Sequence, residues 1–251
     1  MKIQYASDLH LEFRENADYL KNHPIEVVGD ILLLAGDTIY LGEHMEDAGW
    51  FFDYCSQNFK HTYLVPGNHE YYGGFPMEQT LDDFELKVRN NVTYLNNKSV
   101  RIDNTELFFT TLWTKIPEVE GYTIEKIMND CRNNRINGHR FNYHSWLMVH
   151  NKCVRWLSSA PQNSDAVYKI VVSHHCPYMS TEIRRYVGAM AESAYSTPAL
   201  TMMGNFDIKT WIHGHIHLQL QNQEHGINVV SNPMGYVDDD EHQKFSHNVC
   251  I

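Results

Sequence analysis

Five short polar motifs, each at the end of an apolar run, constrain the fold of this chain more than any other feature of its sequence. The motifs are Asp8-Leu9-His10, Gly36-Asp37, Gly67-Asn68-His69-Glu70, His174-His175 and Gly214-His215-Ile216-His217. The apolar runs before them cover residues 2–8, 30–35, 61–65, 168–172 and 210–212. Such runs are typical of strands buried on both faces of a parallel sheet. Because ligands collect at the carboxyl ends of parallel strands, we expect the five motifs to form one common site.

The segments between these strands indicate helices and antiparallel hairpins. Apolar residues lie on one helical face over three stretches, from Met45 to Phe59, from Leu81 through Phe84 to Val88, and from Leu147 to Leu157. Two hairpins are predicted, from Val100 to Trp113 around Asp103-Asn104-Thr105 and from His217 to Val230 around His225-Gly226. The predicted fold class is therefore α/β with mixed sheets.

The length of 251 residues predicts a single domain over residues 1–251, since no linker or internal repeat divides the chain. Two segments match none of the predicted elements. They are residues 115–142, rich in Asn and Arg, and residues 177–206, rich in Met, Ala and Ser. The sequence leaves open whether they are lid-like excursions over the site or plain surface loops.

The charge balance narrows the partners of the chain. It has 20 basic and 31 acidic residues and a formal net charge of -11. Clustered Lys and Arg are needed to bind a nucleic-acid polymer or an anionic membrane, so this composition argues against both partners. No apolar stretch is long enough for a membrane helix. The five scattered cysteines and the lack of a signal peptide predict free thiols in a cytoplasmic protein.

The motifs together supply carboxylate, imidazole and amide groups. This is the ligand mixture that a two-metal hydrolase needs. Nitrogen and oxygen donors fit Mn, Fe, Zn or Ni, and no residue in the chain selects among these metals. The sequence therefore predicts two divalent or trivalent metal ions as cofactors.

The ordered set of motifs resembles the signature of the calcineurin-like metallophosphoesterase superfamily. That signature is D-x-H, G-D, G-N-H-[DE], a lone H and G-H-x-H, and all five blocks occur in this order between residues 8 and 217. No single block is specific, whereas the ordered set is. The resemblance implies a four-layer fold in which two mixed β-sheets pack as a sandwich flanked by helices, with the metals at the strand ends.

The resemblance also implies a ligand set and a mechanism. The first metal would be bound by Asp8, His10, Asp37 and His217. The second metal would be bound by Asp37, Asn68, His174 and His215. Asp37 would bridge the two ions, and a hydroxide held between them would attack phosphorus in line. His69 binds no metal in this scheme and assists the departure of the leaving group.

Some neighbouring residues have alternative interpretations. Adjacent residues at a strand end point in opposite directions, so only one of His174 and His175 is expected to bind metal, and the resemblance favours His174. His175 is then a residue behind the ligands or a contact to the substrate. His213 is expected to be a packed residue, and Glu70 either orients a neighbour or faces solvent.

Substrate contacts are predicted around the presumed acid. The candidate residues are Asn68, His69, His175, Tyr71 and Tyr72. Aromatic walls suit a nucleobase or another organic group, which favours the two tyrosines. Both are equally compatible with ordinary core or loop positions.

The chain departs from two branches of the superfamily. Gly36-Asp37-Thr38-Ile39-Tyr40 fits a block in which purple acid phosphatases bind iron through tyrosine, but those enzymes have glycine where His10 stands. We therefore expect no bond from Tyr40 to iron. The Asp-Arg-Gly sequence that follows the G-D block in Ser/Thr protein phosphatases is absent. The stretch from Asn232 to Tyr236 resembles an Asn-Pro-Arg-Gly-Tyr segment of some bacterial relatives, with Met234 replacing arginine.

The function predicted from these residues is hydrolysis of phosphomonoesters or phosphodiesters of small or medium size. A nuclease is the alternative enzyme, and the net charge disfavours it. A non-catalytic binding module with the same fold is the alternative from another class. Such modules have lost the histidine that corresponds to His69, which this chain retains.

Overall fold

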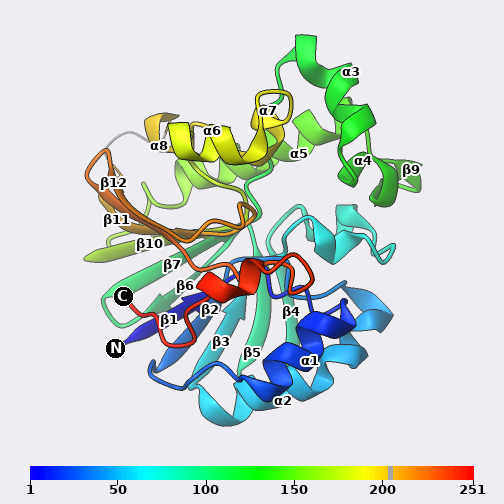
Figure 1. Cartoon of the computed structure of the whole chain (residues 1–251). Helices are drawn as coiled ribbons and strands as arrows, with labels where there is room; N and C mark the ends of the chain where they lie inside the picture. The colour runs from blue at the N-terminus through cyan, green and yellow to red at the C-terminus, as the bar shows by residue number, and fades with distance from the viewer. Residues whose placement is uncertain (203–205) are drawn as a thin grey trace.

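The computed structural model describes residues 1–202 and 206–251 and shows two large β-sheets packed face to face (Figure 1). The first sheet has the strand order β1 (Ile3–Ala6), β2 (Ile31–Leu34), β3 (His61–Leu64), β5 (Val92–Asn96), β4 (Phe84–Arg89). The second has the order β12 (Leu220–Glu224), β13 (Ile227–Ser231), β11 (Ile208–His213), β10 (Tyr168–Ser173), β7 (Thr105–Thr110), β6 (Lys98–Ile102). The edge strands β4, β12 and β6 run antiparallel to their neighbours, and the strands between them pair in parallel.

Helices cover the outer faces of both sheets (Figure 1). α1 (Arg14–Asn22) and α2 (Gly49–Asn58) lie against the first sheet, and α5 (Tyr143–Ser159) lies against the second. The other α-helices are α3 (Glu118–Ile127), α4 (Asp130–Asn133), α6 (Thr181–Val187), α7 (Glu192–Tyr195) and α8 (Ala199–Met202). Short 3₁₀ helices are η1 (Gly42–Ala48), η2 (His69–Tyr71), η3 (Met77–Thr80) and η4 (Glu241–Lys244). This arrangement confirms the predicted α/β sandwich of two mixed sheets flanked by helices.

The apolar runs form central strands because both of their faces are buried. In β2, Ile31 and Leu33 join the cluster between the two sheets. Leu32 and Leu34 alternate with them and join the cluster beneath the helices of the first sheet. A period of two places successive side chains on opposite faces, so each face of this strand meets an apolar layer. The five predicted strands are confirmed, each within a few residues of its expected bounds.

Helix α5 follows its sequence pattern closely. The side chain of Asn142 caps its first turn by accepting a hydrogen bond of 3.0 Å from the backbone N–H of Ser145. The side chains that the helix buries recur every three or four residues, and they include Trp146, Val149, Cys153 and Leu157. The helix predicted between Leu147 and Leu157 is therefore confirmed.

The helix predicted over Leu81, Phe84 and Val88 is wrong, because residues Phe84–Arg89 form the edge strand β4. Apolar and charged residues alternate through Phe84-Glu85-Leu86-Lys87-Val88-Arg89, which is the period of a strand with one buried face. Phe84, Leu86 and Val88 pack against the core on that face. Phe84 and Val88 also fit a helical face, and pairing with β5 selects the strand.

The register of the sheets brings the motifs together. Leu34 of β2 lies opposite Ala6 of β1 and Leu64 of β3, so the loops after these three strands begin side by side. The second sheet joins them at the same edge, where His174 Nδ1 donates to the Ala35 carbonyl at 2.9 Å. The motifs after β10 and β11 therefore meet those of the first sheet.

The two unassigned segments both reach the edge where the motifs meet. Residues 115–142 contain α3, α4 and the small hairpin of β8 (Arg135–Ile136) and β9 (His139–Arg140). Residues 177–206 contain α6, α7 and α8, and residues 203–205 of this segment lie outside the described residues. Both segments contribute side chains to one pocket. Within residues 1–202 and 206–251, no helix combines the length and apolarity needed to cross a membrane.

Candidate metal centre

The side chains predicted as ligands form two adjoining groups, and Asp37 of the second group also contacts His10 of the first. Asp8, His10 and His217 form one group, and Asp37, His174 and His215 form another, with the ligand atoms of each within 4.8 Å of one another. His10 and Asp37 also form a third group with His69. The seventh predicted ligand is Asn68, whose side-chain oxygen lies 2.8 Å from His174 Nε2.

The donor atoms in the first group face one another in a way that requires positive charge between them. His10 and His217 each direct Nδ1 at a carboxylate, Glu12 and Glu241 respectively. Their Nε2 atoms then face each other at 3.3 Å, and Asp8 Oδ1 lies 3.5 Å from the Nε2 of His217. Two imidazole lone pairs and a carboxylate oxygen repel unless a proton or a cation stands among them.

The second group has the same character. His174 donates its Nδ1–H to the Ala35 carbonyl, so its Nε2 lone pair faces the side-chain oxygens of Asn68 and Asp37. The Nε2 atom of His215 is buried and has no hydrogen-bond partner among the described atoms. A buried imidazole nitrogen without a partner is unfavourable, and metal coordination would satisfy it. The residues present therefore fit metal ions in both groups.

The protonation states agree with a site that demands cations. Burial lowers the pKa of His217, but hydrogen bonds to Asp8 and Glu241 raise it to about 10. Burial raises the pKa of Asp37, yet nearby histidines, His174 foremost, bring it well below its usual range. Asp37 is thus ionised, and His217 holds a proton that metal binding would displace.

Several of these ligands share an unusual backbone conformation, which also occurs at other residues of the described chain. Four of them have left-handed φ angles, which are 53° for Asp8, 48° for His10, 52° for Asp37 and 66° for His215. Such angles are uncommon for residues with a side chain and are concentrated at functional sites. Here they occur shortly after the ends of β1, β2 and β11, where the chain turns into the loops that carry the site.

Two motif glycines are required because side chains of the site occupy the space of a Cβ atom. A Cβ at Gly36 would lie 2.2 Å from His174 Nδ1, and the φ of this residue is 89°. A Cβ at Gly67 would lie 2.1 Å from Asp37 Oδ1. The glycine before each ligand block therefore permits ligands from different loops to approach closely.

Glu70 joins the loops that follow β2 and β3. Its buried carboxylate accepts backbone N–H bonds from Asp37 at 3.0 Å, Thr38 at 2.9 Å and Gly67 at 2.7 Å. The alternative in which Glu70 faces solvent is therefore wrong, and it orients neighbouring backbone. This side chain holds the turn that presents Asp37 in its left-handed conformation.

Glu12 and Glu241 were not singled out from the sequence. A single oxygen of Glu12 lies 3.1 Å from His10 Nδ1 and 2.9 Å from His69 Nδ1. Glu241 Oε2 lies 2.5 Å from His217 Nδ1. Glu12 lies two residues after His10, and this proximity in the sequence is a signal that could have identified it. Glu241 comes from the distant 3₁₀ helix η4, and no motif in the sequence marks it.

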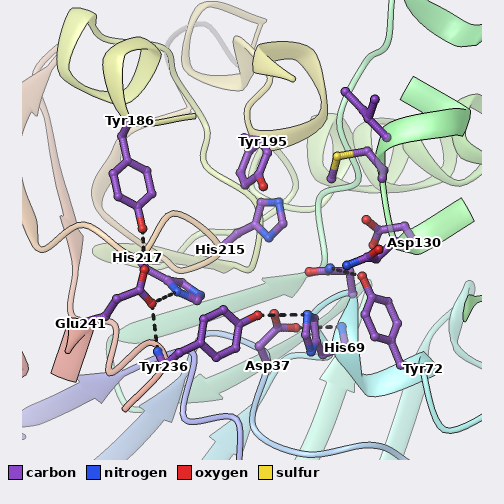
Figure 2. A pocket seen from close by; sticks show the side chains of 14 residues that line it. Asp37, His69, Tyr72, Asp130, Tyr186, Tyr195, His215, His217, Tyr236 and Glu241 are labelled. Carbon is purple, nitrogen blue, oxygen red and sulfur yellow. Dashed lines mark hydrogen bonds and ion pairs between the residues drawn. The ribbon is translucent and has the colours of Figure 1, made fainter. Parts of the chain in front are cut away.

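A pocket of about 230 Å³ opens onto the ligand groups (Figure 2). Its floor includes Asp37, Asn68, His69, His215 and His217. Residues 127–130 come from one excursion, and Tyr186 and Tyr195 from the other. Tyr72, Tyr236 and Glu241 complete the lining, and no Lys or Arg contributes to it among the described residues.

The predicted substrate contacts divide into those that reach this pocket and those that do not. Tyr72 lines it, stacks on His69 with ring centroids 4.2 Å apart, and accepts a bond from Asn68. Tyr71 instead lies in the core, where its hydroxyl bonds Thr80 at 2.7 Å. His175 is buried behind the ligands, with Nδ1 3.0 Å from the Thr111 carbonyl. Neither Tyr71 nor His175 lines the pocket, so neither is positioned to contact a substrate there.

The tyrosine of the G-D block does not resemble a metal ligand. The ring of Tyr40 lies beside those of His44 and Tyr72, at centroid distances of 5.7 and 6.4 Å. Burial, with Glu12 and Asp37 nearby, raises the pKa of Tyr40 to about 12. The neutral phenol is therefore favoured over the tyrosinate that an iron bond needs.

The stretch from Asn232 to Tyr236 contributes a wall of the site. The ring of Tyr236 lies 4.6 Å from that of His10, and its hydroxyl is 3.5 Å from His69 Nε2. Met234, at the position of arginine in the resembling segment, is fully buried in the apolar core. Because its thioether is uncharged and buried, Met234 does not replace the charged contact that an arginine could make to phosphate.

Comparison with known proteins agrees with this geometry. A family model described as calcineurin-like phosphoesterase matches residues 1–219. The chain belongs to the calcineurin-like phosphoesterase family. The match spans all five motifs and confirms the resemblance that they indicated. An uncharacterized protein of Acanthamoeba polyphaga mimivirus is 26% identical over 263 residues, covering 93% of this chain and 91% of that protein.

Solved structures similar to this chain include a hydrolase and a phosphatase. The phosphopantetheinyl hydrolase of Mycobacterium tuberculosis superimposes with a TM-score of 0.68 at 16% identity, covering 97% of this chain and 92% of that one. A dimetal phosphatase from Danio rerio gives a TM-score of 0.49 at 14% identity, covering 92% and 86% of the two chains. At these identities the first likeness shows the fold alone.

Proposed function

We propose that this family member is a dinuclear metal-dependent hydrolase of phosphomonoesters or phosphodiesters. The observation that carries the proposal is the pair of adjoining ligand groups, Asp8–His10–His217 and Asp37–His174–His215. Their lone pairs converge on two places, and the orphaned Nε2 of His215 belongs to the second. Such a site binds two cations about 3.5–4 Å apart when one carboxylate bridges them.

Asp8, His10, Asp37 and His217 would hold the first metal, and Asp37, Asn68, His174 and His215 the second. Bound at these positions, Mn, Fe, Zn or Ni ions would activate a water nucleophile and withdraw charge from the phosphoryl oxygens. The carboxylate of Asp37 reaches both groups, which suits it to a bridging position.

His69 would donate a proton to the leaving oxygen. Its Nδ1 is held by Glu12, which leaves Nε2 directed at the pocket beside the hydroxyl of Tyr236. Burial lowers the pKa of His69, but the Asp37 and Glu12 carboxylates outweigh it and raise that pKa above its usual value. The protonated form that a general acid requires is therefore favoured.

The substrate would be a compact ester rather than a polymer. A net charge of -11 and a pocket without Lys or Arg in the described part of the chain oppose a nucleic-acid polymer. A pocket of about 230 Å³ accepts the phosphoryl group with a small organic part. The hydrolase of phosphopantetheinyl esters that shares the fold makes this ester class worth including in a substrate panel.

The decisive experiment combines elemental analysis with turnover. Purified protein loaded with Mn2+ or Ni2+ is expected to cleave p-nitrophenyl phosphate, bis(p-nitrophenyl) phosphate, or both. His69→Ala should retain the metals and lose most turnover, whereas Asp37→Ala should lose both metals. Equal metal loss in the two variants would assign His69 to metal binding. Its ligand atom lies close enough to those of His10 and Asp37 for such a role. No cleavage of either ester by fully loaded protein would contradict the enzyme proposal and favour a binding module.

A further inference from the structure

One acidic side chain in the pocket has no part in the scheme above. Asp130 begins α4 in the excursion over residues 115–142, and it is only 1% exposed. It nevertheless lines the pocket, and its Oδ1 atom is buried with no hydrogen-bond partner among the described atoms. Figure 2 shows Asp130 beside Tyr72, across the pocket from Tyr186 and Glu241.

A buried carboxylate oxygen without a partner costs free energy, so its position in the fold calls for a ligand. The other acidic group of the lining, Glu241, is satisfied by His217, Tyr186 and the backbone of Tyr236. Asp130 Oδ1 has no such partner among the described atoms, and no Lys or Arg of the described chain lines the pocket. An ionised carboxylate only accepts hydrogen bonds, so the group that would satisfy Oδ1 is a donor.

The position of Asp130 places it on the leaving-group side of the site. It lines the same pocket as His69 and Tyr72. Figure 2 shows it beside Tyr72, the ring stacked on His69. Because His69 serves the departing oxygen in the proposed function, the alcohol part of the ester would extend past His69 toward Asp130.

We infer that Asp130 determines specificity by accepting a hydrogen bond from an amine or hydroxyl on the alcohol part of the phosphate ester. The inference rests on the proposed function. An ammonium group would give the stronger bond, since it also neutralises the carboxylate. The tyrosines that line the remaining wall, Tyr72, Tyr186, Tyr195 and Tyr236, tolerate a cation because their ring faces are electronegative.

The inference is tested by binding, which does not depend on turnover. Calorimetry on metal-loaded protein compares ethylphosphonate with 2-hydroxyethylphosphonate and with aminoalkylphosphonates of two, three and four methylene groups. These compounds differ in the terminal donor and its reach, and none can be hydrolysed. We expect the best aminoalkylphosphonate to bind about tenfold to hundredfold more tightly than ethylphosphonate, with the hydroxyl compound between them.

Two variants identify the group responsible. Asp130→Asn keeps the shape and removes the charge, and it should reduce the preference for the amine at least about tenfold. Glu118→Gln removes an exposed acid from the same excursion and should leave the preference unchanged. Equal affinities for all the phosphonates in the natural protein would overturn the inference. So would an Asp130→Asn variant that keeps the natural preference, or one that weakens all ligands equally, since the latter assigns Asp130 to support of His69.

Turnover separates this inference from the proposed function. Ethyl phosphate and 2-aminoethyl phosphate are compared by phosphate release, and the ratio of their kcat/KM values should fall in Asp130→Asn. Hydrolysis of both esters at equal kcat/KM would overturn the inference and leave the proposed function in place. Failure to hydrolyse any ester would overturn the proposed function. The phosphonate affinities would still decide whether Asp130 binds the amine or hydroxyl of the ligand.

Discussion

Replacing Glu12 offers a sharp test of how the site is organised, because one oxygen of this residue holds two histidines with different roles. Glu12 Oε1 accepts from Nδ1 of His10, a proposed ligand, at 3.1 Å, and from Nδ1 of His69, the proposed acid, at 2.9 Å. Both bonds fix the tautomer in which Nε2 faces the centre of the site. The Glu12 side chain is only 5% exposed, so water does not readily replace these bonds.

The expected magnitude follows from these two bonds. A hydrogen bond to a charged acceptor contributes about 1.5–3 kcal/mol and a neutral one about 0.5–1.5 kcal/mol. Glu12→Gln keeps the shape and removes the charge, so each bond weakens by about 1 kcal/mol, or about fivefold. Glu12→Ala removes both bonds and should cost about 10–100-fold in metal affinity or turnover.

The effect on metal binding and the effect on catalysis are measured separately, the second of them at saturating metal. Metal affinity is measured by titrating metal-free protein, and it reports the bond to His10. The kcat for p-nitrophenyl phosphate at saturating metal reports the bond to His69. Glu15→Gln, an exposed substitution in α1, serves as the control. If Glu12→Gln binds metal and turns over like the natural protein, Glu12 does not orient either histidine and our reasoning is refuted.

Three further predictions follow from the geometry. Gly67→Ala should lower metal content and the urea midpoint of unfolding, because its Cβ would lie 2.1 Å from Asp37 Oδ1; natural metal content by elemental analysis would contradict the clash. Tyr72→Phe should lower kcat several-fold, because it removes the bond to Asn68. Tyr71→Phe should keep its kcat and lose about 1 kcal/mol of the free energy of unfolding, because it removes the bond to Thr80. Assays of kcat and urea unfolding on both variants check this. Chelation should lower Tm by several degrees, since metal at a hundredfold excess over its Kd contributes about 2.7 kcal/mol; an unchanged Tm would argue against bound metal.

Most of the fold could be predicted from the sequence because short apolar runs mark its central strands. A run such as Ile31 to Leu34 needs two apolar faces, and only a central strand between helices and a second sheet provides them. The helix prediction over Phe84–Arg89 is wrong because Phe84 and Val88 fit both a helical face and an alternating face. Pairing with β5 decided between the two, and that contact is absent from the local sequence.

The order of the five motifs by itself indicated the family, and through the family the reaction class and ligand set that we propose. Those residues sit directly at strand ends, so sequence position and place in the sheet coincide. Only the tertiary structure revealed that Glu12 holds two histidines and that Glu241 holds His217. It also revealed that Asp130 Oδ1 has no hydrogen-bond partner among the described atoms. Their roles depend on contacts between loops and excursions far apart in the chain. A side chain's partner there is set by packing, which no local spacing encodes.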